Sequence, residues 1–316
     1  NNQGADFPEL FEGICQRMGK LTPRLWGHAA MLLFSALVAG SFSLGAQVAN
    51  DIAPLALNAV RFWLAASLIG LALFAGTGIP RGAFRSSWRY AVLGGLFGTY
   101  FVLMFEGLKT AEPVSTAAVF TLTPVLSAFF GWVLLRQVTT PRMAVALAIG
   151  ACGAVWVIFR ADIDALRAFE IGRGEMIFFV GCICHAVYTP MVRKLNKGEP
   201  VLVFTFGTLV GGGVVLTLFG ARDLVSTSWG TLPAMVWFTL GYVAIFASAA
   251  SVWLLQTATL RLPSAKVMAY TYLVPSWVII WEAAQGKPLP SVWVLGGVVL
   301  TMTALALLLR DEDAHR

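Results

Sequence analysis

Charged residues are scarce in this 316-residue chain: Asp, Glu, Lys and Arg together make up 12% of it, while 58% is hydrophobic. A soluble globular domain carries about 25% charged residues. The shortage excludes an ordinary soluble domain, and the net charge of +6 does not imply a nucleic-acid partner. We predict an all-α membrane protein whose main partner is the lipid bilayer.

Residues that bind metals or carry catalysis are also few. The chain has three His and four Cys, and Cys152, Cys182 and Cys184 fall inside apolar runs. No spacing suits zinc, and Cys182 to His185 is one residue short of the haem attachment pattern. The motifs His-Glu-x-x-His and Gly-x-Ser-x-Gly and paired intramembrane aspartates do not occur. We therefore expect no enzyme activity, no cofactor and no metal site.

Long apolar runs occupy most of the chain. A membrane-spanning helix needs about 20 apolar residues. By that measure we predict ten spans, over residues 26–49, 54–75, 89–108, 113–135, 141–159, 174–195, 200–220, 232–260, 264–284 and 291–309. The eighth is longer than a bilayer requires, so we expect it to tilt or to project.

Basic residues are unevenly distributed between the polar segments. With the N-terminus in the cytoplasm, 15 Lys and Arg fall in cytoplasmic segments and 6 in external ones, and Arg61 lies within a span. Cytoplasmic loops carry such an excess, so we predict that both termini are cytoplasmic. The longest polar interruption, 160–173, separates five spans from five. Because five is odd, the second half must cross the membrane in the opposite orientation, as an inverted repeat.

These features divide the chain into five parts. Sequence identity between the halves is low: placing residues 113–136 on 264–287 matches only three of 24 positions, so hydropathy and charge indicate the repeat. The expected parts are a cytoplasmic N-terminal segment (1–25), a first five-helix repeat (26–159), an external linker (160–173), a second five-helix repeat (174–310) and a cytoplasmic tail (311–316).

Two spans carry a proline near the middle, Pro124 in the fourth and Pro275 in the ninth. Proline inside a helix removes an amide donor and frees the carbonyl four residues back, here those of Phe120 and Thr271. Interrupted spans at matching positions of two halves indicate a transporter's site near the membrane midplane. Ordinary proline kinks are the alternative. We predict a water-filled cavity beside the two breaks.

Three stretches resemble the EamA-type drug/metabolite transporter superfamily. Residues 58–66 (NAVRFWLAA), 115–124 (STAAVFTLTP) and 264–275 (SAKVMAYTYLVP) are similar to its second, fourth and ninth spans, and the last match is the most specific. The ten-span layout covers 26–310. Where the family usually has Gly-Glu after its fourth and ninth spans, this chain has Arg136-Gln137 and Gly286-Lys287.

Within that superfamily the chain resembles bacterial exporters of aromatic and other apolar amino acids. The similarity rests on residues 96–100 (LFGTY), 186–189 (AVYT) and 238–241 (FTLG) and on Tyr272. It implies a central cavity lined by spans 1, 3, 4, 6, 8 and 9. It also implies cavity positions at Tyr100, at His185 and, before the fourth-span proline, at Thr123.

Uncharged polar and aromatic groups inside the spans are the candidate substrate ligands. Such a lining suits a zwitterion with an apolar side chain better than a phosphate. His185 either lines the cavity or is a hydrogen-bonded packing residue, and we interpret Arg61 as a structural charge rather than a carboxylate ligand. The candidates are Tyr100, Thr121, Thr123, His185, Tyr188, Trp253, Gln256, Tyr272 and Ser276, with helix breaks at Pro124 and Pro275.

The resulting hypothesis is a secondary transporter of small molecules in the bacterial inner (plasma) membrane. We expect it to export amino acids by alternating access, either aromatic and other apolar ones or small neutral ones such as threonine and methionine, and to act as a monomer. A carrier of purines, sugars or drugs from another branch of the superfamily is the alternative. A passive channel is a second alternative, which saturable counterflow would exclude.

Overall fold

The computed structural model describes residues 23–76, 78–80, 82–168 and 170–310. The predicted segment 1–25 therefore lies largely, and the tail 311–316 entirely, outside the described residues. Within them, ten helices are long and apolar enough to cross a bilayer, which confirms the ten predicted spans. Their bounds lie within a few residues of the predicted ones.

Seven spans are single helices: α2 (Pro23–Val48), α3 (Pro54–Ala75), α4 (Trp88–Gly107), α7 (Pro141–Ile158), α9 (Arg173–Leu195), α10 (Val201–Phe219) and α16 (Val292–Arg310). Proline opens several of them because its missing N–H is not needed in the first helical turn. In α7 the Thr140 side chain also caps the helix by accepting a hydrogen bond from Met143 N–H at 3.2 Å. Short elements α8 (Ile163–Ala168), α11 (Ala221–Ser226) and η1 (Trp229–Thr231) lie between spans.

The other three spans are interrupted. The fourth consists of α5 (Pro113–Phe120) and α6 (Thr123–Leu135), and the ninth of α14 (Ser264–Ala269), the 3₁₀ turn η3 (Tyr270–Leu273) and α15 (Val274–Ala284). Both breaks fall at the predicted prolines. The eighth span joins α12 (Ala234–Ala244) and α13 (Ser251–Thr259) through a π-helix, η2 (Ile245–Ala250). This π-helix was not predicted, and it widens the helix inside the longest span.

Contacts between the spans follow a two-fold pattern. The fifth span packs on the tenth (α7 with α16), the fourth on the ninth, and the second on the seventh (α3 with α10). The pair α4 with α9, spans three and six, matches the pair α13 with α2, spans eight and one. When every span is shifted by five positions, each of these pairs becomes itself or another pair of the set, as an inverted repeat of five helices requires.

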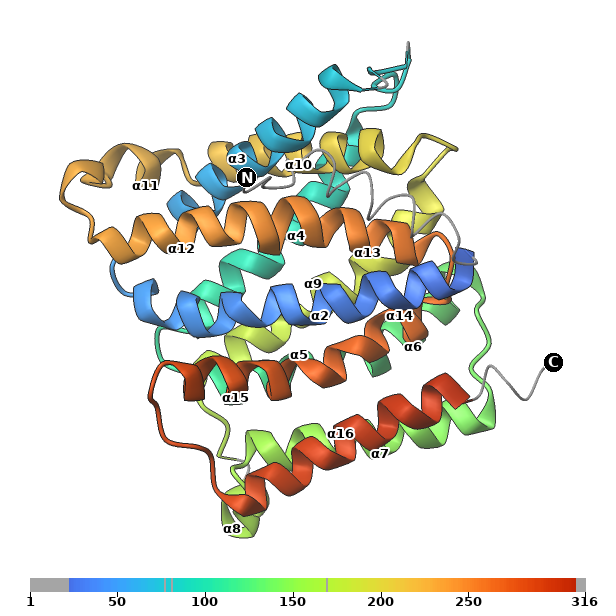
Figure 1. Cartoon of the computed structure of the whole chain (residues 1–316), viewed down its shortest axis with the longest axis vertical. Helices are drawn as coiled ribbons and strands as arrows, with labels where there is room; N and C mark the ends of the chain where they lie inside the picture. Colours follow the sequence, from blue (N-terminus) through green and yellow to red (C-terminus); the bar gives the residue numbers. More distant parts are fainter. Residues whose placement is uncertain (1–22, 77, 81, 169, 311–316) are drawn as a thin grey trace, which may run out of the picture.

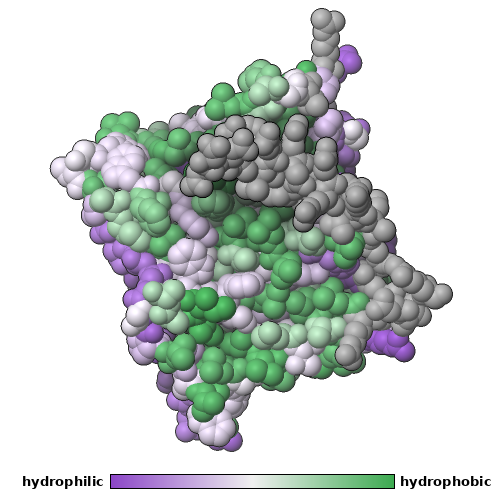
Figure 2. Space-filling view, in the orientation of Figure 1, coloured by the Kyte–Doolittle hydropathy of each residue, from purple (hydrophilic) through white to green (hydrophobic). Residues whose placement is uncertain are grey.

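Figure 1 shows α2 in front, with α12 and α13 above it and α14 and α15 below it, all running in roughly the same line, while α3 and α4 cross them at a slant. The α7–α16 pair forms one edge of the stack, and α3 and α10 form the other. Close approach of α4 and α10 requires glycine, because a Cβ at Gly94 would collide with the α10 backbone at Gly212. Where this face is visible, Figure 2 shows mostly apolar side chains, with hydrophilic ones along the edges where helices end.

Candidate functional site between the repeats

The two helix breaks meet in the interior. Thr123 Oγ1 of the first repeat lies 3.3 Å from Thr271 Oγ1 of the second, and both residues are fully buried. Thr123 also donates a hydrogen bond to the Phe120 carbonyl at 2.6 Å, the carbonyl that Pro124 deprives of its helical donor. Both Pro124 and Pro275 are buried rather than lipid-facing.

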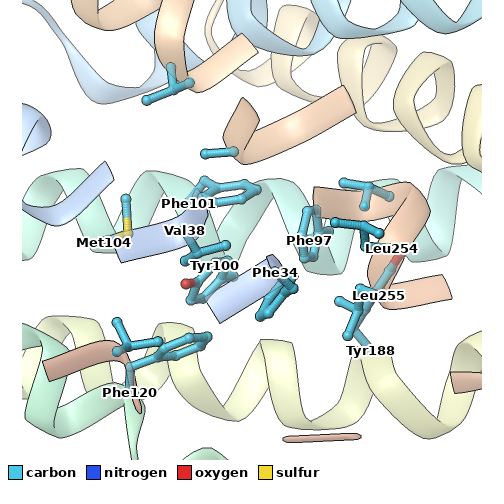
Figure 3. Packing of buried hydrophobic residues seen from close by; sticks show 14 of the residues in the cluster. Phe34, Val38, Phe97, Tyr100, Phe101, Met104, Phe120, Tyr188, Leu254 and Leu255 are labelled. Carbon is cyan, nitrogen blue, oxygen red and sulfur yellow. The ribbon is translucent and has the colours of Figure 1, made fainter. Parts of the chain in front are cut away.

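A cluster of aromatic rings surrounds His185 of α9. The ring centroids of Tyr100, Phe120 and Phe97 lie 4.5, 5.3 and 5.4 Å from that of His185. Tyr188, one helical turn beyond His185, lies 4.7 Å from Phe97. These rings come from α4, α5 and α9. Figure 3 shows four of them, those of Phe97, Tyr100, Phe120 and Tyr188, packed together with Phe34 and Val38 of α2. Aromatic side chains thus occupy the space directly around His185, and the water-filled cavity expected beside the breaks stays a prediction.

Three polar atoms in this cluster have no hydrogen-bond partner among the described residues. They are the Tyr100 hydroxyl and both ring nitrogens of His185, which are all fully buried. More than nine in ten buried polar groups are normally paired, and leaving one unpaired costs about 1–3 kcal/mol. Unpaired groups of this kind therefore indicate where a polar ligand or water is bound in another state.

Gln256 of α13 has a different environment, because its amide is fully engaged by the protein. Its Nε2 donates to the Tyr188 hydroxyl at 2.9 Å and to Thr208 Oγ1 at 3.1 Å, and its Oε1 accepts from Thr205 at 2.7 Å. The amide thereby ties spans six, seven and eight together. Thr121 is also satisfied, since it donates to the Ala118 carbonyl at 2.6 Å.

The remaining candidates lie away from the His185 cluster. Tyr272 packs against α7, where a Cβ at Gly150 would collide with its ring, and its hydroxyl has no partner among the described residues. Ser276, one turn beyond Tyr272, also has an unpartnered hydroxyl. Trp253 is half-buried and packs on Trp26 with ring centroids 6.1 Å apart. The structure therefore brings Tyr100 and His185 together but places Tyr272 closer to the fifth span.

Arg61 is a charged residue at the edge of the cluster, next to Phe101, and its guanidinium is fully hydrogen-bonded. Its guanidinium lies 3.4 Å from the centroid of the Phe101 ring and donates to the Ala247 carbonyl at 2.6 Å. It also donates to Ser248 Oγ and, at 3.3 Å, to Asn58 Oδ1. Ala247 and Ser248 belong to the π-helix η2, so Arg61 stabilises that element. This arrangement agrees with the interpretation of Arg61 as a structural charge.

The helix ends nearest Pro23 are tied together by polar contacts. Gln137 Oε1 accepts from Ser264 N–H at 3.2 Å, and Arg193 donates to the Leu262 carbonyl at 3.1 Å. Arg89 forms a 2.6 Å ion pair with Glu199. Burial alone would raise the pKa of Glu199, but hydrogen bonds from Arg89 and from the Lys197 amide, with the charge of Arg89, hold it below its usual value.

Such an assembly of ten spans, with opposed repeats and two helix breaks in contact, defines a membrane transporter of small molecules. The sequence profile of the EamA-like transporter family matches residues 25–159 and again 172–310. The chain belongs to the EamA-like transporter family, and each match covers one repeat.

Two further similarities support this assignment. The chain is 27% identical over 284 residues to the uncharacterized transporter YyaM of Bacillus subtilis (strain 168), covering 88% of this chain and 92% of that protein. A crystal structure of a protein that is 20% identical superposes with a TM-score of 0.68, covering 90% of this chain and 95% of the other. At that identity the superposition supports the fold alone.

Proposed function

We propose that the protein exports small neutral metabolites, chiefly amino acids with aromatic, apolar or small neutral side chains, by alternating access. The observation that carries this proposal is the set of unpartnered groups on Tyr100 and His185 inside an aromatic cluster between the repeats. A zwitterion would use the hydroxyl and imidazole as hydrogen-bond partners. The side chain of the substrate would pack on Phe97 and Phe120 in place of the present contacts between the aromatic rings.

The charge distribution favours a substrate without net charge. Arg61 lies over Phe101, the ring beside Tyr100, and its donors already serve Ala247, Ser248 and Asn58. A phosphate or polyanion would need several free cationic groups at the same depth, because an unpaired charge in the membrane is costly. A neutral zwitterion needs hydrogen bonds instead.

Alternating access would use the two breaks as pivots. The breaks meet at Thr123 and Thr271, and polar contacts close the helix ends near Pro23. Because aromatic rings pack directly around His185, substrate binding would rotate Tyr100 and His185 out of their present packing. With both termini in the cytoplasm, as predicted, the substrate would enter at the end near Pro23, which these polar contacts close in the present structure. We place the protein in a bacterial inner membrane and infer that one copy suffices for transport.

Counterflow in proteoliposomes tests this function. Vesicles loaded with unlabelled tryptophan, threonine or methionine should accumulate the corresponding labelled amino acid, and excess unlabelled substrate outside should saturate the uptake. The variant Tyr100→Phe should reduce uptake by about tenfold, the effect of losing one charge-assisted hydrogen bond worth about 1.4 kcal/mol. Tyr90→Phe is the matched control, because the Tyr90 hydroxyl donates to the Ala83 carbonyl, away from the cluster.

Two outcomes would contradict parts of the proposal. Uptake of purines, sugars or cationic drugs without uptake of any amino acid would favour the other branch of the superfamily. Equal loss of uptake in Tyr100→Phe and Tyr90→Phe would show that the Tyr100 hydroxyl is not a hydrogen-bond partner of the substrate.

A further inference from the structure

A pocket of about 550 Å³ opens where α5 and α16 begin and α7 and α15 end. Both repeats supply its walls. Its apolar surface comes from Val157 of α7, Ile279 of α15 and Val294 of α16, which are all buried. Prolines 288 and 290 stiffen the loop that closes one side, because proline fixes its own backbone angle φ. This volume is typical of sites for small ligands.

Four charged side chains line the pocket in two ion pairs. Lys287 Nζ lies 2.7 Å from Glu282 Oε2, and the Glu282 side chain is only 11% exposed. Arg160 and Glu112 form a longer pair of 3.4 Å, and their side chains are 64% and 67% exposed. Exposed pairs contribute little and exchange partners easily. Glu282 is therefore the fixed charge of the pocket, and Arg160 is available to a ligand.

The second carboxylate oxygen of Glu282 is an unused acceptor. Glu282 Oε1 is buried and has no hydrogen-bond partner among the described residues, although Lys287 occupies Oε2. An ionised carboxylate accepts hydrogen bonds at both oxygens. Because Glu282 lines the pocket, a molecule bound there can donate to Oε1.

The position of Arg160 is set by unusual backbone. The helix α7 ends with two consecutive residues in the left-handed region, Arg160 at φ 55° and Ala161 at φ 60°. The Ala161 amide donates to the Trp156 carbonyl at 2.9 Å, as in a helix end where glycine is usual. Such conformations cost energy and persist where the surroundings enforce them. Here the result is a guanidinium on the pocket wall.

We propose that this pocket binds a small molecule that joins a primary ammonium group to an apolar body. The ammonium group donates to Glu282 Oε1, and the apolar body packs on Val157, Ile279 and Val294. An α-carboxylate, where the ligand has one, meets Arg160. The site is separate from the Tyr100–His185 cluster and does not depend on the function proposed above. The same chemistry occurs in soluble amines and amino acids and in an aminophospholipid headgroup.

Binding of tritiated tryptamine and tryptophan to the purified full chain tests the site. Nanodiscs of phosphatidylcholine are used because that lipid has no primary ammonium group. Saturable binding is expected, and Glu282→Gln should weaken the binding of both probes by about tenfold or more, equivalent to at least about 1.4 kcal/mol. Glu106→Gln is the matched control. Its carboxylate pairs with Lys109 at 2.7 Å but has no part in the pocket, so affinity should stay at the wild-type value.

A second variant guards against misfolding at position 282. Leu289 is 66% exposed on the loop beside the pocket, so Leu289→Trp should fold normally while filling part of the site. It should also weaken binding about tenfold. The absence of saturable binding in wild type, or wild-type affinity in both Glu282→Gln and Leu289→Trp, overturns the proposal whatever the counterflow assay gives.

Lipid composition identifies the source of the ligand. Phosphatidylethanolamine added to the nanodiscs should lower the apparent tryptamine affinity of wild type, but not of Glu282→Gln, if a lipid headgroup occupies the pocket. Unchanged affinity assigns the pocket to soluble amines and amino acids. Either result supports the shared ammonium chemistry.

Discussion

The hydroxyl oxygens of Thr123 and Thr271 lie 3.3 Å apart at the point where the two broken spans touch. Each belongs to a different repeat: Thr123 directly precedes Pro124, and the carbonyl of Thr271 is the one that Pro275 deprives of its helical donor. Since Thr123 donates to the Phe120 carbonyl, Thr271 is the donor between the two hydroxyls. The Thr123 hydroxyl thus has two roles: it contacts the other repeat, and it supplies a hydrogen bond to the Phe120 carbonyl that Pro124 leaves without its helical donor.

The two threonines should differ in their effect on stability. Thr271→Val removes only the contact between repeats and should lower the free energy of unfolding by about 0.6 kcal/mol, a typical value for interhelical hydrogen bonds in membranes. Thr123→Val also leaves the Phe120 carbonyl unpaired and should cost about 1–3 kcal/mol. Denaturation in mixed detergent micelles measures both.

A control for the threonine series is Thr303→Val, whose exposed hydroxyl donates only to the Val299 carbonyl of its own helix. It should be nearly neutral. The double variant Thr123→Val with Thr271→Val should cost less than the sum of the single variants, because the two share a contact. Strict additivity would show that the contact between the repeats contributes nothing.

Arg61 should be essential for the π-helix. Arg61→Met keeps the apolar length of the side chain but removes the donors that reach the Ala247 carbonyl and Ser248. We expect a loss of about 3 kcal/mol or more, because several buried polar groups lose their partner at once. Detergent denaturation checks this, with Arg85→Met, an exposed residue, as the neutral control. A variant as stable as wild type would show that η2 does not need the arginine.

Glycine should be preferred at position 161. Ala161 has a φ of 60°, and glycine adopts that conformation without the steric cost of a Cβ. Ala161→Gly should therefore raise the free energy of unfolding by about 0.5–1 kcal/mol. Thermal denaturation of the purified protein measures the gain. Ala165→Gly, inside the short helix α8, is the control and should lower the melting temperature, because glycine is unfavourable inside a helix. A lower melting temperature for Ala161→Gly would contradict the prediction.

Stability should depend on pH through Glu199. Its pKa in the folded protein is held below the ordinary value of 4.5, so the unfolded chain binds the proton more readily. The stabilisation from Glu199 is fully present above pH 4.5 and is lost as the pH falls through the folded pKa. Glu199→Gln should thus melt at a lower temperature than wild type at pH 7, and the difference should shrink below pH 4.5.

Melting curves at pH 7 and at acid pH, recorded for wild type and Glu199→Gln in the same detergent, make this comparison. Glu170→Gln, which changes an exposed carboxylate, serves as the control. A constant difference between wild type and Glu199→Gln across the pH range would disprove the assigned ion pair.

Most of the fold could be predicted from the sequence because long apolar runs have few alternatives to a membrane helix. The fourth span was predicted at 113–135 and runs over Pro113–Leu135. Pro124 and Pro275 also located both breaks, since the loss of an amide donor is a local property of the chain. Gln256 was a candidate substrate ligand because it is a polar group inside a span, and in the structure its amide is instead bonded to Tyr188, Thr205 and Thr208.

Features that depend on distant segments could not be predicted. The run Ile245–Ala250 has no unusual composition, and it forms a π-helix where Arg61 of another span docks on it. Tyr272 was expected among the substrate ligands, but its ring packs over Gly150 of α7, a neighbour that lies more than 100 residues away in the sequence. The pocket around Glu282 is formed by four helix ends and a loop. Hydropathy and turn residues locate each of these segments in the sequence, but they do not show that the segments meet.

The π-helix places one more residue in its turn than an α-helix would hold. Removing a single residue between Ile245 and Ala250 would therefore leave a continuous α-helix in which α12 and α13 keep their facing directions, because the wider turn already absorbs the extra residue. Gln256 would still face Tyr188 and Thr208, but the turn on which Arg61 docks would be altered. Comparisons between relatives should thus allow a one-residue gap in the middle of this span.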